Sequence, residues 1–353
     1  MSAMTVSEIF AALHQQGLAA DPLAPELPAR PLGTPWYVRV MAGFGAWLGG
    51  LFLLGSLMTI FSVAANSPGG MMVLGLGVLA TAFFIYRAAG DSEAVQQLAL
   101  ACSMAGQFSL GFGAEDFFHL GTVRLAGFLF LLQAVLVFLM TGALHRFLSA
   151  WFAALAGYYV LFQMQALALG AAVLAVSVTW LWLNEAAWTA ARRAALWRPV
   201  GYALALALLF WEAPFSVLSW TLDWGHESVK LGVPHWCGPL AYVLCLVATA
   251  GVLARRLAPQ KTAVWIVAAL LISAVAWLAP GLLAALLVLI LGQAAGKRAL
   301  IGLALLAAIW YLGAYYYQIQ ITLLQKSGVM LATGAVLIAL RFVLSGLWPE
   351  KKS

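Results

Sequence analysis

A succession of long apolar runs constrains this chain more than any other feature. About twelve runs follow one another, each close to the roughly 20 residues that a helix needs to cross a bilayer. They cover residues 40–64, 70–86, 95–113, 124–141, 147–164, 166–183, 200–221, 237–254, 262–279, 281–295, 299–318 and 328–347. Charged residues make up 8% of the chain, whereas soluble domains carry roughly 25%. The sequence therefore excludes a soluble globule and predicts an all-α polytopic membrane helix bundle of about 12 transmembrane helices.

Two pairs of neighbouring runs are separated by very short breaks. The fifth and sixth runs are divided by Gln163 and Gln165, and the ninth and tenth by Pro280 and Gly281. Each pair is compatible with two spans or with one broken element.

The runs and the segments between them divide the chain into five parts. Residues 1–35 hold a short amphipathic helix, which Thr5 and Glu8 cap, and a proline-rich tether; we expect this part to dock on the bundle or on a partner. The others are a first half of about six spans (36–183), an interfacial linker helix (184–199), a second half of about six spans (200–347) and a tail (348–353). An echo between residues 144–159 and 296–316 is compatible with a 6+6 parallel repeat or with chance.

Basic residues give the expected orientation. With twelve spans and both termini inside, fifteen lysines and arginines are cytoplasmic and three are outside. The outside residues are Arg124, Lys230 and Lys326. Cytoplasmic loops of membrane proteins carry the basic excess, so we expect a multi-pass protein of the bacterial inner membrane with cytoplasmic N- and C-termini.

Glu212 is the clearest acidic residue at bilayer depth, near the middle of the seventh run. A carboxylate there costs about 2.5–3.5 kcal/mol to insert, so it should face the bundle interior and find a partner or a proton. Pro214 predicts a kink beside it. Two interpretations stay open, a proton- or cation-responsive carboxylate and a buried acid satisfied by a neighbouring Tyr, Gln or Trp.

Two expected outside loops gather most of the remaining acids and histidines. Each contains an Asp-x-x-His spacing, which suits an acid–base or zinc site, although solvated loops are also where the polar residues of such a chain must lie. The residues are Glu115, Asp116 and His119 in the first loop, and Asp223, His226, Glu227 and His235 in the second.

Other polar residues have structural interpretations as well as functional ones. Gln133 and Gln107 lie within spans, where hydrogen bonds between helices explain them without a ligand. Arg341 lies near the cytoplasmic end of the last span and can extend to the interface. Lys326 follows an aromatic segment that is typical of an interfacial belt, or alternatively lines an outward-facing cavity that attracts an anionic group.

Common catalytic and nucleotide-binding motifs are missing from the sequence. It has no Walker A loop, HExxH, GxSxG or dinucleotide fingerprint, so we expect no cofactor and no metal. No basic run with interleaved aromatic residues is present, so the expected partner is the lipid bilayer and not nucleic acid.

Two aromatic motifs resemble a known family. They are Pro35-Trp36-Tyr37-Val38-Arg39-Val40, running into Gly43–Leu48, and Tyr315-Tyr316-Tyr317 followed by Thr322–Gly328. They resemble the bacterial membrane family catalogued as domain of unknown function 4401, over nearly the whole chain. The resemblance implies a bacterial inner-membrane protein, often encoded beside a small membrane-anchored protein with a GDYXXLXY motif, which is therefore a candidate partner. It implies no substrate and no catalytic residues.

The intramembrane acid beside a predicted kink favours a permease-like or channel-like protein for a small solute or ion. One alternative is a lipid- or envelope-modifying enzyme that uses the outside Asp, His and Glu residues. Another is a scaffold or assembly subunit for an envelope partner. The missing motifs make an enzyme the less favoured class.

Overall fold

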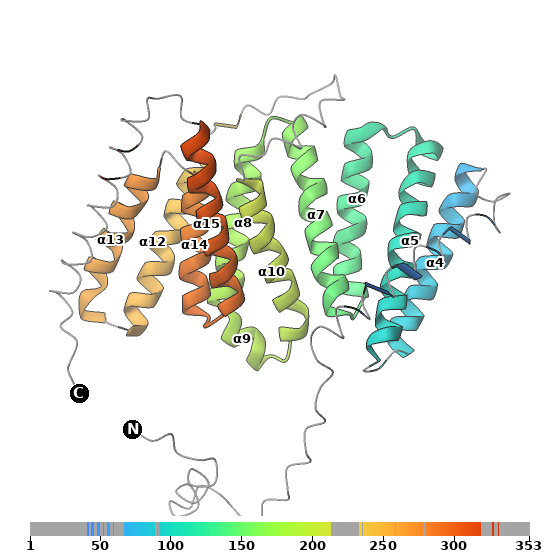
Figure 1. Ribbon diagram of the computed structural model, residues 1–353, viewed down its shortest axis with the longest axis horizontal. Coiled ribbons are helices and arrows are strands. Elements are labelled where there is room, and N and C mark those ends of the chain that lie inside the picture. The colour runs from blue at the N-terminus through green and yellow to red at the C-terminus, as the bar shows by residue number, and fades with distance from the viewer. Residues whose placement is uncertain are drawn as a thin grey trace, which may run out of the picture.

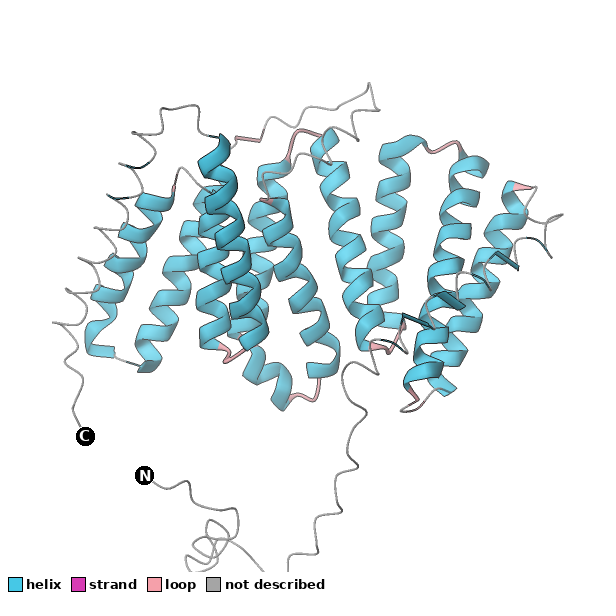
Figure 2. Ribbon diagram, in the orientation of Figure 1, coloured by secondary structure: helices cyan, strands magenta, loops and turns pink. Residues whose placement is uncertain are grey.

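The structure is a computed structural model. It describes residues 67–88, 90, 92–212, 233–234, 236–257, 259–277 and 280–318, together with single positions between 41 and 59 and at 327 and 331. Within these residues it contains eleven α-helices, one short 3₁₀ helix and no strand (Figure 2). The N-terminal segment 1–35 and the tail 348–353 lie outside the described residues.

The helices are arranged side by side and nearly upright, with α4 and α5 at one edge and α13 at the other (Figure 1). Their bounds are α4 Pro68–Ala88, α5 Glu93–Phe118, α6 Gly121–Leu139, α7 Ala143–Gln163, α8 Leu167–Leu183, α9 Glu185–Ala190, α10 Ala194–Trp211, α12 Cys237–Leu257, α13 Thr262–Ala276, α14 Pro280–Ala294 and α15 Arg298–Gln318; η1 covers Pro259–Lys261.

The helices follow the apolar runs of the sequence. Each expected run that lies in the described residues coincides with one long helix, and both closely spaced pairs are separate helices. At the first break Gln165 has a φ of 53°, which turns the chain between α7 and α8. Among the described helices, four are long and apolar enough to cross a membrane: α4, α6, α10 and α12. The protein is thus helical, with apolar helices suited to a membrane.

The segment 184–199 differs from the expected single linker helix. Helix α9 spans only Glu185–Ala190, the chain reverses at Arg192 with a φ of 56°, and α10 begins at Ala194. Pro199 lies inside α10 and has no N–H for the carbonyl of Ala195. Arg146 of α7 donates to that carbonyl at 3.1 Å. This guanidinium from a neighbouring helix lets α10 begin before the proline.

The largest buried cluster lies among α8, α10, α12, α14 and α15. It contains Leu208, Tyr242, Leu283, Leu287 and several alanines, all almost fully buried. Small alanine side chains let these helices pack closely, as helices do where lipid replaces water as the solvent.

Outside this cluster, α4 and α5 form a closely packed pair. A Cβ atom on Gly75 would lie 2.7 Å from the backbone nitrogen of Leu110 and 2.8 Å from the carbonyl of Gly106. A Cβ on Gly106 would lie 2.8 Å from the carbonyl of Gly75. The two backbones therefore touch at these glycines, and this contact fixes one face of α5 against α4.

We predict that Gly75→Leu lowers the free energy of unfolding by about 3 kcal/mol, because overpacking against backbone atoms cannot be relieved by moving a side chain. Gly77→Leu is the matched control, since Gly77 is on the same helix and has no heavy atom within 4 Å of its added Cβ. Thermal unfolding of both variants in detergent tests this. Equal midpoints would contradict the close contact.

Candidate ligand-binding site

A cavity of about 470 Å³ lies between α5, α6 and α7. Its walls are almost entirely apolar: Met104, Phe108, Gly111 and Phe112 of α5, Leu125, Ala126 and Leu129 of α6, and Phe152, Leu155, Ala156 and Tyr159 of α7. It exists because α5 is packed closely on α4 and contacts α6 far less extensively. Phe108 and Phe112 are 56% and 62% exposed, so the cavity is open to its surroundings.

Two glutamines belong to the polar part of the cavity wall, beside Glu115 and the hydroxyl-bearing Tyr159. Gln133 Nε2 of α6 donates to Gln107 Oε1 of α5 at 2.6 Å, and both side chains are 6% exposed. This bond confirms the expected pairing of polar side chains between helices. It also places two amides at the boundary of a largely apolar cavity.

The glutamine pair begins a longer series of buried hydrogen bonds. Gln107 Nε2 donates to Ser103 Oγ at 3.0 Å, and Ser103 Oγ lies 2.7 Å from His145 Nε2. The other ring nitrogen of His145 lies 3.2 Å from Ser149 Oγ. We call Gln133, Gln107, Ser103, His145 and Ser149 the polar chain. It joins α5, α6 and α7 through side chains that are nearly inaccessible to solvent.

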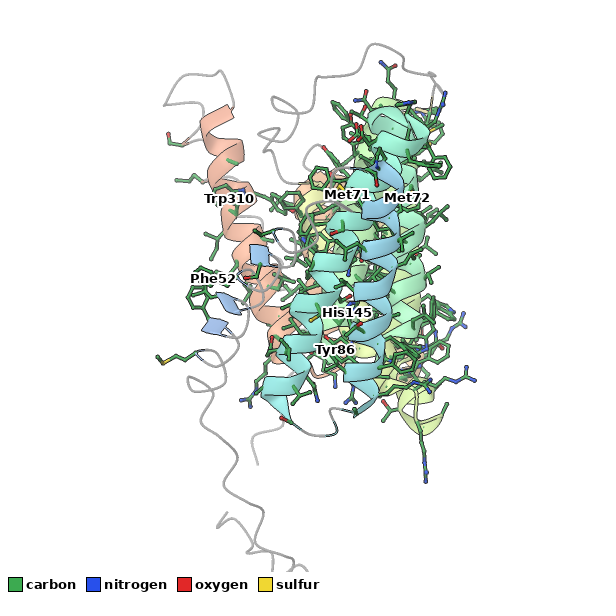
Figure 3. All side chains as sticks on the ribbon, turned by 90° about the vertical axis from the view of Figure 1, so that its right-hand side faces the viewer. Phe52, Met71, Met72, Tyr86, His145 and Trp310 are labelled. Atoms are coloured by element: carbon green, nitrogen blue, oxygen red, sulfur yellow. The ribbon has the colours of Figure 1, made fainter. Side chains whose placement is uncertain are left out.

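Tyr86 covers the His145 end of the polar chain. Its ring meets the imidazole edge to face, with centroids 5.5 Å apart (Figure 3). Gly142 is the residue that makes room for the tyrosine, since a Cβ there would lie 2.6 Å from Tyr86 Cε1. The imidazole is thus held from two sides, by serine hydroxyls and by an aromatic ring.

The cavity end of the polar chain is unsatisfied. Gln133 Oε1 is buried and has no hydrogen-bond partner among the described residues. Turning the amide over would exchange its oxygen and nitrogen without supplying a partner for the second group. An unpaired buried polar group costs about 1–3 kcal/mol, so Gln133, a residue that lines the cavity, carries an unfilled hydrogen-bonding position.

The first expected outside loop is the end of a helix. Glu115 and Asp116 lie in the last turn of α5 and His119, with a φ of 47°, is its C-cap. All three side chains are exposed, and Glu115 lies at the rim of the cavity. No hydrogen bond or ion pair joins Asp116 to His119 in the part of the chain that the structure describes, and no cluster of three possible metal ligands occurs there.

Several candidates from the sequence lie outside the described residues. They are Asp223, His226, Glu227, His235, Lys326 and Arg341. The predictions made for them stay predictions.

Glu212 directly follows the last residue of α10. It is the C-cap residue, because α10 begins at Ala194 and ends at Trp211. Tyr242, which is fully buried on α12, donates to Glu212 Oε1 at 2.7 Å. Tyr242 is five residues from the start of α12, about 7.5 Å at the helical rise. The acid is therefore near one end of the bundle, satisfied by a tyrosine; its proton- or cation-responsive role stays a prediction. The kink expected at Pro214 lies outside the described residues.

Aromatic side chains surround the end of α10. The hydroxyl of Tyr311 on α15 donates to the carbonyl of Leu209, one of the carbonyls that a helix end leaves without an intrahelical partner. Trp211 meets Tyr158 of α7 edge to face, with centroids 4.8 Å apart. Together with Tyr242 of α12, side chains from three neighbouring helices therefore hold this helix end in place.

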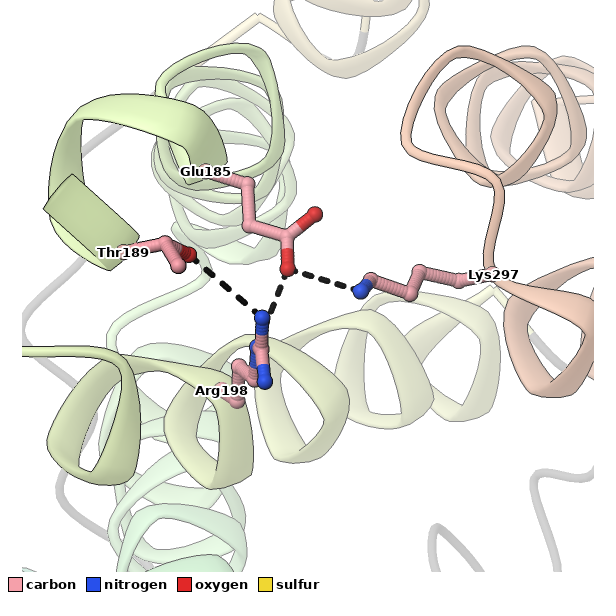
Figure 4. A network of polar contacts seen from close by, with 4 residues as sticks. All are labelled: Glu185, Thr189, Arg198 and Lys297. Carbon is pink, nitrogen blue, oxygen red and sulfur yellow. Dashed lines mark hydrogen bonds and ion pairs between the residues drawn. The ribbon is translucent and has the colours of Figure 1, made fainter. Parts of the chain in front are cut away.

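At the opposite end of α10, an ion-pair network joins three segments (Figure 4). Glu185 of α9 accepts from Arg198 Nε of α10 at 3.0 Å and lies 2.8 Å from Lys297 Nζ, in the connection between α14 and α15. Thr189 accepts a further bond from Arg198 at 3.4 Å. Arg198 is 44% exposed, so solvent weakens the pair. We assign the network a structural role.

Sequence reasoning missed Ser103, His145 and Ser149 as members of a site. Their signal is the spacing of polar residues within apolar helices: Ser103 with Gln107, and His145 with Ser149, are each four residues apart and share a helix face. Two such pairs on neighbouring spans indicate a buried polar connection.

The apolar helices and the buried polar chain define a helical membrane protein. The sequence profile of the family described as Domain of unknown function (DUF4401) matches residues 35–347, and the chain belongs to that family. No curated protein and no solved structure matches the chain.

We predict that Tyr242→Phe lowers the free energy of unfolding by about 1–3 kcal/mol, because Glu212 loses its buried donor. Tyr202→Phe on α10 is the control, since its ring also packs on an aromatic neighbour, Trp182, at 5.0 Å and it is only partly buried. Chemical unfolding in detergent measures both. Equal losses would show that the Tyr242 hydroxyl contributes nothing specific.

Proposed function

We propose that this protein is a permease-like membrane protein that binds a small, largely apolar solute in the cavity between α5, α6 and α7. The observation that carries the proposal is the open cavity of about 470 Å³, lined by Gln133, whose buried amide oxygen is unpaired. Cavities of this size, with apolar walls and few polar groups, are typical of small-molecule sites.

The opening of the cavity supports entry from the bilayer. Phe108 and Phe112 line the cavity and are also exposed on the flank of the helix bundle. In a membrane this flank faces lipid, so a solute that partitions into lipid reaches the cavity without crossing a polar surface. The glutamines are uncharged, which favours a neutral solute over an ion.

We further propose about twelve spans, arranged as two sets of six, in the bacterial inner membrane with both termini cytoplasmic. The connections α4–α5, α6–α7, α8–α10, α12–α13 and α14–α15 lie at one end of the bundle (Figure 1). Ten of the described lysines and arginines belong to these connections or to the helix turns beside them, namely Arg87, Arg146, Arg192, Arg193, Arg198, Arg255, Arg256, Lys261, Lys297 and Arg298. Arg124 instead lies in the first turn of α6, at the other end. This asymmetry supports a cytoplasmic assignment for the basic end.

A reporter fused after Ser353 tests the orientation. We expect activity of a cytoplasmic reporter, such as a fluorescent protein, and none from a periplasmic phosphatase. Activity of the phosphatase at this position, or of a cytoplasmic reporter inserted beside Arg124, would contradict the proposed topology.

Photolabelling tests the cavity. We expect an alkanol that carries a diazirine to label peptides of α5, α6 and α7 in protein held in lipid nanodiscs, and we expect Ala156→Trp to reduce that labelling at least about tenfold because the indole fills the cavity. Ala274→Trp is the matched control, since Ala274 is exposed on α13, far from the cavity (Figure 1).

Unchanged labelling in folded Ala156→Trp would overturn the proposed function. Equal loss in both tryptophan variants would do the same, because it would trace the effect to the added indole and not to the cavity.

A further inference from the structure

The hydrogen bonds of the polar chain have a common direction. Gln133 donates to Gln107, and Gln107 donates in turn to Ser103. Since Ser103 Oγ already accepts a bond, its own hydroxyl hydrogen is available for His145 Nε2, 2.7 Å away. A neutral imidazole that accepts at Nε2 carries its proton on Nδ1 and can donate it to Ser149. Every link then donates away from the cavity.

The direction of these bonds determines which atom of the Gln133 amide is left free for a ligand. Because the Gln133 nitrogen is used in the bond to Gln107, its oxygen Oε1 is the group left without a partner. The amide cannot reverse alone, since two oxygens of Gln133 and Gln107 would then face each other with no hydrogen between them. With the bonds in this direction the free position is an acceptor, and Gln107 and Ser103 hold it in that state, because a donor there would require every link of the polar chain to reverse together.

We propose that the cavity selects molecules with an apolar body and one uncharged hydrogen-bond-donating head, of which a long-chain alcohol is the simplest, and that Gln133 Oε1 accepts the bond from that head. The inference rests on the proposed function and names its solute class. Gln133 is the binding residue, while Gln107, Ser103 and His145 are positioning residues that act through it.

The charges near the cavity support an uncharged head. The acid at the rim, Glu115, is eight residues beyond Gln107 on α5, about 12 Å along the helix. A cationic head at Gln133 would thus lie without a counter-ion in an apolar surrounding, and an anionic head would meet an acceptor. Both are costly within a membrane.

Comparing an alcohol with its methyl ether distinguishes the contribution of the hydrogen-bond donor to binding from that of the apolar body. Decanol and decyl methyl ether carry the same decyl chain, but only the alcohol donates a hydrogen bond. With photolabelling of the cavity as the readout, and competitor concentrations expressed per lipid, we expect decanol to compete about tenfold better than the ether, which is the effect of one buried hydrogen bond.

Variants of the polar chain then test the mechanism of selection. We expect Gln133→Leu to remove the acceptor and bring the ratio of the two competitors close to one, while labelling itself persists. Ser103→Ala leaves Gln133 in place but removes the acceptor that orients Gln107, so the ratio should fall there as well. Thr81→Ala is the control that keeps the ratio, since it removes an exposed hydroxyl that bonds to the carbonyl of Gly77 within α4 and does not line the cavity.

The outcomes distinguish the two claims. A preference near tenfold that persists in folded Gln133→Leu or in folded Ser103→Ala overturns the inference, as does a wild-type preference for the ether. If Gln133→Leu does not fold, the competitor ratio measured for Ser103→Ala alone tests the inference. Labelling that Ala156→Trp does not reduce instead overturns the proposed function, whatever the competitor ratio.

Discussion

Polar side chains in a membrane interior need hydrogen-bond partners, and in this protein five of them bond to one another in one series that ties α5, α6 and α7 together and leaves only Gln133 Oε1 of that series without a partner. The bond from Gln133 to Gln107 crosses between α5 and α6, where backbone contacts are sparse. Ser103 and His145 extend the connection to α7. Without this series, the side of α5 that faces the cavity would have few attachments to the rest of the bundle.

The cavity results from two opposing demands on α5. On one side Gly75 and Gly106 bring α5 into backbone contact with α4. On the other side the polar chain joins α5 to α6 and α7 through side chains, and backbone contacts between α5 and α6 are few. The rest of the bundle contrasts with this region: α8, α10, α12 and α14 pack through alanines and leucines that are almost fully buried. The helices α8, α10, α12 and α14 are therefore closely packed, whereas α5, α6 and α7 leave a cavity with room for a solute.

Much of this architecture could be predicted from the sequence, since apolar runs specify helices strongly and the described helices coincide with them. The pairing of Gln107 with Gln133 was also accessible, because an amide within a span needs a partner on another span. The start of α10 was not. Residues 194–199 contain Trp197, Arg198 and Pro199 and are typical of a linker, but Arg146 satisfies the carbonyl that the proline frees, so α10 starts earlier, at Ala194. His145 was missed because it lies between Leu144 and Arg146 at the edge of an apolar run, where a cytoplasmic loop was the simpler interpretation. Both errors come from contacts between helices, which periodicity in one segment does not encode.

The most direct test is a cryo-electron microscopy map of the protein in lipid nanodiscs that contain decanol. The account predicts density for an elongated molecule between α5, α6 and α7, with its head within hydrogen-bond distance of the Gln133 amide and its chain along the apolar walls. A map in which α5 and α6 close against each other, or in which another side chain of the protein occupies the free position on Gln133, would contradict it.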